Sequence, residues 1–159
     1  MSHVSDRRRA RELTLQACYA HEMSGNDPDE ILTEVILNKI EPVLNLKFAE
    51  ELFRRTVAHL SEFDEIIKLK AVNWEFNRIA ILDKLILRMA ICEFLYFDDI
   101  PPKVSIDEAI EIAKKFSTEK SGRFVNGILD AVLSDLRRSG RMQKRGRGLS
   151  EGPRKPPAG

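Results

Sequence analysis

The chain has 159 residues, of which 43% are apolar and 32% are charged. This length supports a domain with its own core without disulfides or metal, and the apolar fraction is too high for a disordered chain. No apolar run reaches the ~18 residues that a membrane helix needs, and the charged N-terminus lacks a signal-peptide core, so we expect a cytoplasmic protein.

Apolar residues recur at helical spacing along most of the chain, and no alternating strand pattern is present. The expected helices cover residues 5–24, 28–40, 46–60, 62–70, 78–97, 105–117 and 121–136. The helix over 78–97 is the most apolar, and we expect it to be central because its apolar residues occupy more than one face. Asp27 and Pro28 are the predicted N-cap and first residue of the second helix, and Ser105 begins a capping box for the sixth. We predict an all-α fold of about seven helices in two packed bundles that meet near residue 75.

Charge is segregated along the chain, although the net charge is only +1. Residues 137–159 carry eight basic residues and one glutamate, a net charge of +7, whereas residues 1–136 carry 18 basic and 24 acidic residues, a net charge of −6. Glycine and proline punctuate residues 139–159, which we predict to be a disordered basic tail after a folded domain of residues 1–138. Basic ends on an acidic body favour a polyanionic partner.

The sequence contains no GxGxxG, Walker, GxSxG or HExxH motif. Asp107, Glu108 and Glu111 lie near the start of an expected helix, where the helix dipole favours acidic residues without any catalytic role. Cys18 and Cys92 lie in apolar helical patterns, so we expect them to be reduced core residues. Neither they nor the histidines have the spacing of metal ligands. We therefore predict a protein with no catalytic activity, metal or cofactor.

Four arginines lie near the start of the first expected helix: Arg7, Arg8, Arg9 and Arg11. On a helix Arg7, Arg8 and Arg11 share a face, where each guanidinium can bind a phosphate bidentately. Four positive charges at a helix N-terminus oppose the helix dipole, so they suggest a contact with nucleic acid. The alternative is a solvated, charged helix end.

Two phenylalanines lie where the sixth expected helix ends and the seventh begins. Phe116 follows two lysines, and Phe124 follows Arg123. Aromatic faces beside cations are typical of single-stranded RNA binding, but both positions also fit the apolar stripe of a core. Asn126 could bind a base edge or the local backbone. Gly127 costs a helix roughly 1 kcal/mol relative to alanine, and such a glycine usually permits the close approach of another helix or a ligand.

Three separated blocks of the sequence resemble the NusB family. They are RRRARE with QAxY in residues 7–19, LRMAI followed by Glu93 in the middle, and residues 99–130 with the run FVNGILD. The blocks follow the order of the family, and the resemblance covers roughly residues 5–136.

The resemblance implies an all-α fold of two small helical bundles and no enzymatic activity. It implies binding of boxA, a short single-stranded RNA element in ribosomal RNA transcripts, together with NusE, a ribosomal protein of the small subunit. The pair would join other Nus factors on RNA polymerase and suppress premature termination.

The resemblance and the cationic pattern together suggest an RNA-binding set. It comprises Arg7, Arg8, Arg9, Arg11, Arg88, Phe116, Lys120, Arg123, Phe124 and Asn126. Tyr19 and Asp83 resemble the contacts of the family with NusE, although Asp83 is shorter than the glutamate often found there. Lys120 stands where some members carry an acidic residue, and this cation could strengthen RNA binding or weaken binding of the partner. The basic tail would add salt-sensitive RNA affinity that does not depend on sequence.

Three alternatives stay open. The chain could be a ribosome-assembly adaptor without boxA selectivity, or a protein–protein helical module whose arginines are only solvated. It could also be the NusB-like module of an RNA cytosine methyltransferase, a reading that needs a following Rossmann-type domain. The oligomeric state is a separate open question, since the exposed partner surface could also form a homodimer.

Overall fold

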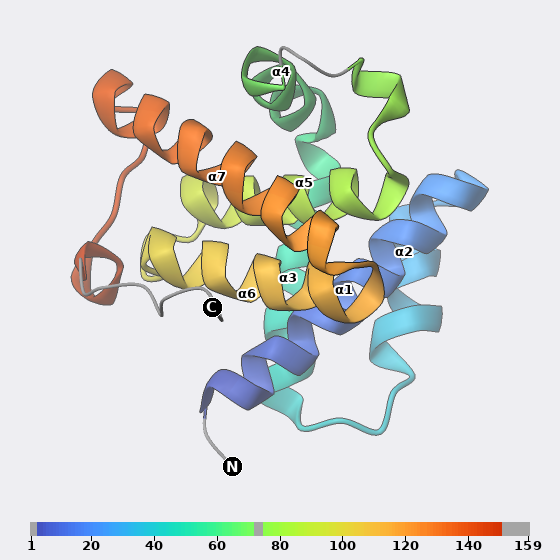
Figure 1. Cartoon of the computed structure of the whole chain (residues 1–159). Helices are drawn as coiled ribbons and strands as arrows, with labels where there is room; N and C mark the ends of the chain where they lie inside the picture. The colour runs from blue at the N-terminus through green and yellow to red at the C-terminus, as the bar shows by residue number, and fades with distance from the viewer. Residues whose placement is uncertain (1–2, 72–74, 151–159) are drawn as a thin grey trace. The chain divides into compact units, whose positions relative to one another are not determined.

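The computed structural model describes residues 3–71 and 75–150, with the side chains of residues 3–5 left out. The described residues form seven α-helices, two short 3₁₀ helices and one π-helical turn, without any strand, which confirms the predicted all-α class. None of the described helices is both long and apolar enough to cross a bilayer. The chain divides into two compact units, Met1–Leu60 and Ser61–Gly159 (Figure 1).

The first unit contains α1 (His3–Ser24), α2 (Pro28–Ile31), the π-helical turn η1 (Leu32–Leu37) and α3 (Val43–Ala58). Asp27 is the N-cap of α2 as predicted, because its Oδ1 accepts a hydrogen bond from the backbone N–H of Asp29 at 2.8 Å. The predicted helix over 28–40 is nevertheless shorter in the structure, since α2 gives way to the π-helical turn and helical structure ends at Leu37.

Helices α1 and α3 pack together in the core of the first unit. The side chains of Leu13, Leu52 and Phe53 are fully buried there. Thr14 ties the two helices with its buried hydroxyl, which lies 3.0 Å from the carbonyl oxygen of Ala10 and 3.2 Å from that of Ala49. A polar group in this core is therefore satisfied by the backbone of both helices.

The second unit contains α4 (Leu60–Lys70), η2 (Phe76–Arg78), α5 (Ile81–Tyr96), α6 (Pro102–Phe116), α7 (Glu119–Ser139) and η3 (Gly146–Leu149). Helix α5 packs against both α6 and α7, and every residue from Leu85 to Phe94 is buried. This confirms the prediction of a central helix, which was based on apolar residues on more than one face. Cys18 and Cys92 are buried free thiols, also as predicted.

The division between the two units lies at Leu60 and Ser61, not near residue 75. The polar contacts of α4 explain this difference, because they go to α5 and α7. Arg88 of α5 binds Asp64 of α4, and the Tyr96 hydroxyl donates to Glu62 at 2.8 Å. These partners lie 24 and 34 residues away in sequence, which local pattern does not reveal.

The start of α6 differs from the predicted capping box at Ser105. The helix begins at Pro102, directly after Pro101, three residues before the predicted cap. Ser105 lies inside the helix, is buried, and donates its hydroxyl to Glu93 Oε1 at 2.7 Å. The serine thus satisfies a buried glutamate of α5, and proline in the first turn starts the helix.

The C-terminal segment 140–150 also differs from the predicted disordered tail. Helix α7 continues to Ser139, and the following residues fold back on the end of α5. Lys144 Nζ donates to the carbonyl oxygens of Glu93 at 2.9 Å and Phe97 at 2.7 Å. Both carbonyl oxygens also accept a backbone N–H, from Phe97 and Ile100 respectively, so the lysine adds a side-chain cap at the C-terminal end of α5. Residues 151–159 of the predicted tail lie outside the described residues.

Candidate nucleic-acid interface

The four arginines of α1 have different surroundings. Arg7 is exposed and its guanidinium carbon lies 4.5 Å from the centre of the Phe48 ring. Arg11 contacts the same ring at 5.3 Å but is only 3% exposed. The two arginines one helical turn apart therefore share one aromatic ring of α3, and only Arg7 is at the surface.

Arg9 is half-buried and takes part in ion pairs. Its Nε lies 2.9 Å from Glu41 Oε1, and its Nη1 lies 3.6 Å from Glu12 Oε1. Arg8 is also half-buried. The cationic patch of α1, defined here as Arg7, Arg8 and Arg9, is thus a partly exposed group of charges at the first turns of the helix.

The second group of predicted residues lies where α6 ends and α7 begins, the bend of an antiparallel helix hairpin (Figure 1). We call this group the α6–α7 junction; it consists of Lys115, Phe116, Lys120, Arg123, Phe124 and Asn126. Phe116 is 38% exposed, and Lys115 Nζ lies 5.3 Å from the centre of its ring. Lys120 and Arg123 are exposed, whereas Phe124 and Asn126 are half-buried. The junction therefore combines an accessible aromatic face with three exposed cations.

The bend that builds the junction is short and well capped. Ser117 ends α6, and Thr118 begins α7 by accepting a hydrogen bond from the backbone N–H of Ser121 at 3.1 Å. Gly122 then lets α7 lie close to α6, since a Cβ at this position would be 2.8 Å from Lys114 Cγ and 3.6 Å from Ile110 Cγ2. Close packing one turn into α7 therefore holds the start of this helix against α6.

Gly127 has a different environment from Gly122. It is exposed, and a Cβ at this position would have no heavy atom within 4 Å apart from its chain neighbours and the backbone of its own helix. Of the two reasons that the sequence suggested for this glycine, the packing of another helix within the described chain is therefore not supported. The close approach of a ligand stays a prediction.

Asp83, a predicted partner contact, lies in the first turn of α5 and is 6% exposed. Ser121 Oγ donates to its Oδ2 at 3.4 Å, while its buried Oδ1 has no hydrogen-bond partner within the described structure. Burial raises the pKa of this carboxyl, and the hydrogen bond from Ser121 partly opposes the rise. Tyr19, the other predicted partner contact, lies on α1 and is 43% exposed.

Arg88 is set apart from the other predicted RNA-binding residues. It is 5% exposed, and its Nε and Nη2 donate to the two carboxylate oxygens of Asp64 at 2.7 Å and 3.0 Å. A planar guanidinium held bidentately in this way joins α5 to α4. The structure therefore gives Arg88 a stabilising contact that the sequence block LRMAI did not reveal.

Lys115 is the junction residue that sequence reasoning left out of the predicted set. Its neighbour Phe116 was chosen as an aromatic face flanked by cations, and the lysine over the ring is one of those cations.

The described residues contain no group of three or more histidine, cysteine or acidic side chains placed to hold a metal ion. The exposed cations of the α1 patch and of the α6–α7 junction can pair with anions, and the exposed ring of Phe116 can stack on a flat aromatic group.

Comparison with known proteins identifies the family. The family model described as NusB family matches residues 8–134. The transcription antitermination protein NusB of Salinibacter ruber is 48% identical over 147 residues, which cover 92% of each chain. Among solved structures, T. maritima NusB has a TM-score of 0.75 at 39% identity and covers 81% of this chain and 91% of that one.

A second solved relative is a crystal structure of the antitermination factors NusB and NusE in complex with dsRNA. It has a TM-score of 0.75 at 26% identity, covering 82% of this chain and 98% of the other. The family match spans most of the sequence, and the match to the Salinibacter ruber protein extends over nearly the whole of both chains. The chain therefore belongs to the NusB family.

Proposed function

We propose that this chain is a transcription antitermination factor that binds boxA RNA as a single strand, together with NusE. It would help to assemble the antitermination complex on RNA polymerase with other Nus factors. Relatives named transcription antitermination protein NusB support a role in antitermination, and the relative solved with NusE and dsRNA supports RNA and NusE as ligands. We infer action by assembly, without a catalytic step.

The observation that carries this proposal is the α6–α7 junction. Phe116 presents part of its ring to solvent beside Lys115, and Lys120 and Arg123 are exposed on the first turns of α7. Bases splayed from a single strand stack on such a ring, and the cations bind the phosphates on either side. Phe124 and Asn126 are half-buried, so we propose that they contact the RNA through the edge that remains accessible.

We further propose that the cationic patch of α1 binds phosphates, with Arg7 as its most exposed member. Arg9 would exchange its contact with Glu41 for a phosphate at little net cost, because a partly exposed ion pair is worth only ~0–1 kcal/mol. Arg11 and Arg88, at 3% and 5% exposure, would serve the RNA indirectly by holding Phe48 and Asp64.

For NusE we propose Tyr19 and Asp83 as contacts. The exposed ring of Tyr19 offers apolar area and a hydroxyl. The buried Oδ1 of Asp83 is an acceptor that a donor from the partner would satisfy, which would remove the cost of an unpaired buried oxygen. Lys120 lies one residue from the Asp83 partner Ser121, so we propose that this cation affects both ligands.

The test is fluorescence anisotropy with a boxA-like RNA and a scrambled RNA of the same composition, with and without NusE. The shortened protein should end at Ser150, because Lys144 caps α5 and a cut at residue 138 would remove that contact. Tighter binding of boxA than of the scrambled RNA, enhanced by NusE, is the expected result. Equal, weak binding of both RNAs that NusE does not improve would instead favour the ribosome-assembly or protein–protein adaptor.

A further inference from the structure

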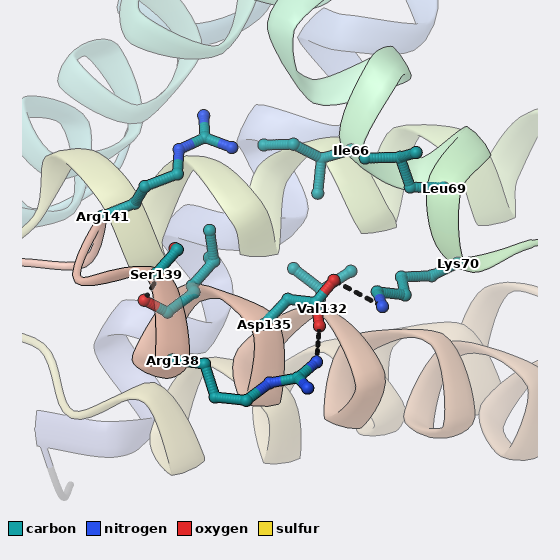
Figure 2. A pocket seen from close by; sticks show the side chains of 9 residues that line it. Ile66, Leu69, Lys70, Val132, Asp135, Arg138, Ser139 and Arg141 are labelled. Atoms are coloured by element: carbon teal, nitrogen blue, oxygen red, sulfur yellow. Dashed lines mark hydrogen bonds and ion pairs between the residues drawn. The ribbon is translucent and has the colours of Figure 1, made fainter.

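A cavity of about 370 Å³ lies in the second unit, between the C-terminal halves of α4 and α7 (Figure 2). Its floor is aliphatic and comes from Ile66 and Leu69 of α4 and from Val132 and Leu136 of α7. Three of these side chains are nearly fully buried, but Leu69 is 69% exposed. The volume is within the ~300–1,000 Å³ of typical ligand sites, and Leu69 extends the aliphatic floor to the surface.

The rim of this cavity is cationic, although the body of the protein is acidic overall. Lys70, Arg138 and Arg141 contribute three positive charges, and Asp135 contributes the single negative one. Asp135 already binds both Lys70 and Arg138 (Figure 2), and these contacts keep its pKa below the ordinary value. Within the described part of the chain, Arg141 has no carboxylate partner of this kind.

Arg141 is brought to the cavity by the segment that folds back after α7. Gly140 ends the helix in the left-handed region, with φ at 70°, and turns the chain. Three residues beyond Arg141, Lys144 is fixed to the carbonyls of Glu93 and Phe97. Because the chain is anchored on both sides, the side chain of Arg141 extends toward Ile66 across the mouth of the cavity (Figure 2).

We propose that this cavity binds a segment of a protein other than NusE, a segment that carries both acidic and apolar side chains, and that it does not bind RNA. An aliphatic or aromatic side chain of that segment would fill the space above Val132 and Leu136, and a neighbouring carboxylate would pair with Arg141. The partner is acidic because the rim has two more positive than negative charges. This inference goes beyond the proposed function and uses none of its residues.

The lining of the cavity favours a protein segment over a nucleotide. Base recognition by single-strand binding proteins depends on aromatic side chains, and none lines this cavity. The hydroxyl of Ser139, the one neutral polar side chain of the lining, is already used, since it donates to the carbonyl oxygen of Leu136 at 3.3 Å. The site therefore offers apolar contact and positive charge, but little to read a base edge.

The experiment uses the full chain and a synthetic helical peptide in which leucines alternate with pairs of glutamates. Of two matched control peptides, one carries glutamine in place of each glutamate and the other carries serine in place of each leucine. Methyl NMR spectra would locate binding, and anisotropy of the labelled peptides would measure affinity. We expect shifts of the methyl groups of Leu69, Val132 and Leu136, and weaker binding of both matched peptides.

Variants of the protein complete the test. Arg141→Gln should weaken binding roughly 5–20-fold through loss of a charge-assisted hydrogen bond, and Leu69→Glu should abolish it. Arg145→Gln, on the same segment but outside the lining, and Leu44→Glu, at another exposed leucine, should leave affinity unchanged. Three results would each overturn the proposal. One is a loss of peptide affinity in Arg145→Gln as large as in Arg141→Gln, and another is binding of the serine peptide as tight as that of the original peptide. The third is methyl shifts that appear with single-stranded RNA but not with the peptide.

Discussion

Phe116→Ala separates RNA stacking from a core role at the α6–α7 junction. The ring is 38% exposed and lies at the last residue of α6. If it stacks on one base, its removal should cost ~1–3 kcal/mol of binding free energy, or roughly 5–150-fold in Kd for boxA-like RNA. A fully buried phenylalanine costs ~3–5 kcal/mol of stability when truncated, so this partly exposed ring should cost about 2 kcal/mol or less.

Phe76 supplies a matched control, because it is half-buried and two lysines lie over its ring. Lys84 Nζ and Lys68 Nζ are 4.5 Å and 5.1 Å from its centre. Phe76→Ala should change RNA affinity less than about twofold, within the error of anisotropy titrations, since the residue is outside the junction. Urea unfolding of both variants gives the stability cost. The reasoning fails if both variants lose affinity equally, or if Phe116→Ala lowers stability and leaves RNA affinity intact.

Three further outcomes follow from the structure. Arg88→Met leaves Asp64 without its guanidinium partner, so the free energy of unfolding measured in urea should fall by roughly 2–4 kcal/mol. The folded variant should keep its RNA affinity, and a stable variant with weakened RNA binding would contradict this. Gly127→Ala should raise the free energy of unfolding by about 0.5–1 kcal/mol, because the added methyl group meets open space, and a loss of stability would contradict the open environment. Burial lowers the pKa of Lys144 to about 8. The unfolded chain therefore binds more protons than the folded one between that value and 10.5, so stability should rise with pH there. In thermal melts up to about pH 9.5, the melting temperature should rise more steeply with pH for the wild type than for Lys144→Met. Above that range the raised pKa of Tyr96 makes stability change with pH in the opposite direction. Parallel melting-temperature profiles of the two proteins would contradict the prediction.

The sequence was sufficient for features that depend on local pattern. The buried run Leu85–Phe94 was predicted as a central helix because its apolar residues occupy more than one face. The cap at Asp27 was predicted because aspartate is a preferred N-cap and proline is favoured at the first helical position. In both cases the residues that determine the structure lie within a few positions of each other.

The sequence was insufficient where a side chain has a partner far along the chain. Ser105 matched a capping box, but its hydroxyl donates a hydrogen bond to Glu93, and the helix begins at Pro102 instead. Lys144 lies in a stretch of glycine and cations that resembles a solvated tail, yet its ammonium reaches two carbonyls about fifty residues away. The backbone N–H of the next residue, Arg145, also donates to the carbonyl oxygen of Asp98 at 2.8 Å, so polar contacts hold a short segment that has almost no apolar residues.

The same limit applies to the candidate interface and explains why the arginines are not equivalent. Arg7 and Arg11 are identical in type and lie one helical turn apart, so periodicity places both on one cationic face. Both guanidiniums lie over the ring of Phe48 in α3, yet Arg11 is 3% exposed while Arg7 is accessible. A charge that is held inside the fold costs desolvation before it can bind a phosphate, whereas an exposed one does not. The capacity of α1 to bind a polyanion therefore depends on how tertiary packing buries each arginine, and the RNA affinity lost in Arg7→Gln should exceed that lost in Arg11→Gln among molecules that remain folded.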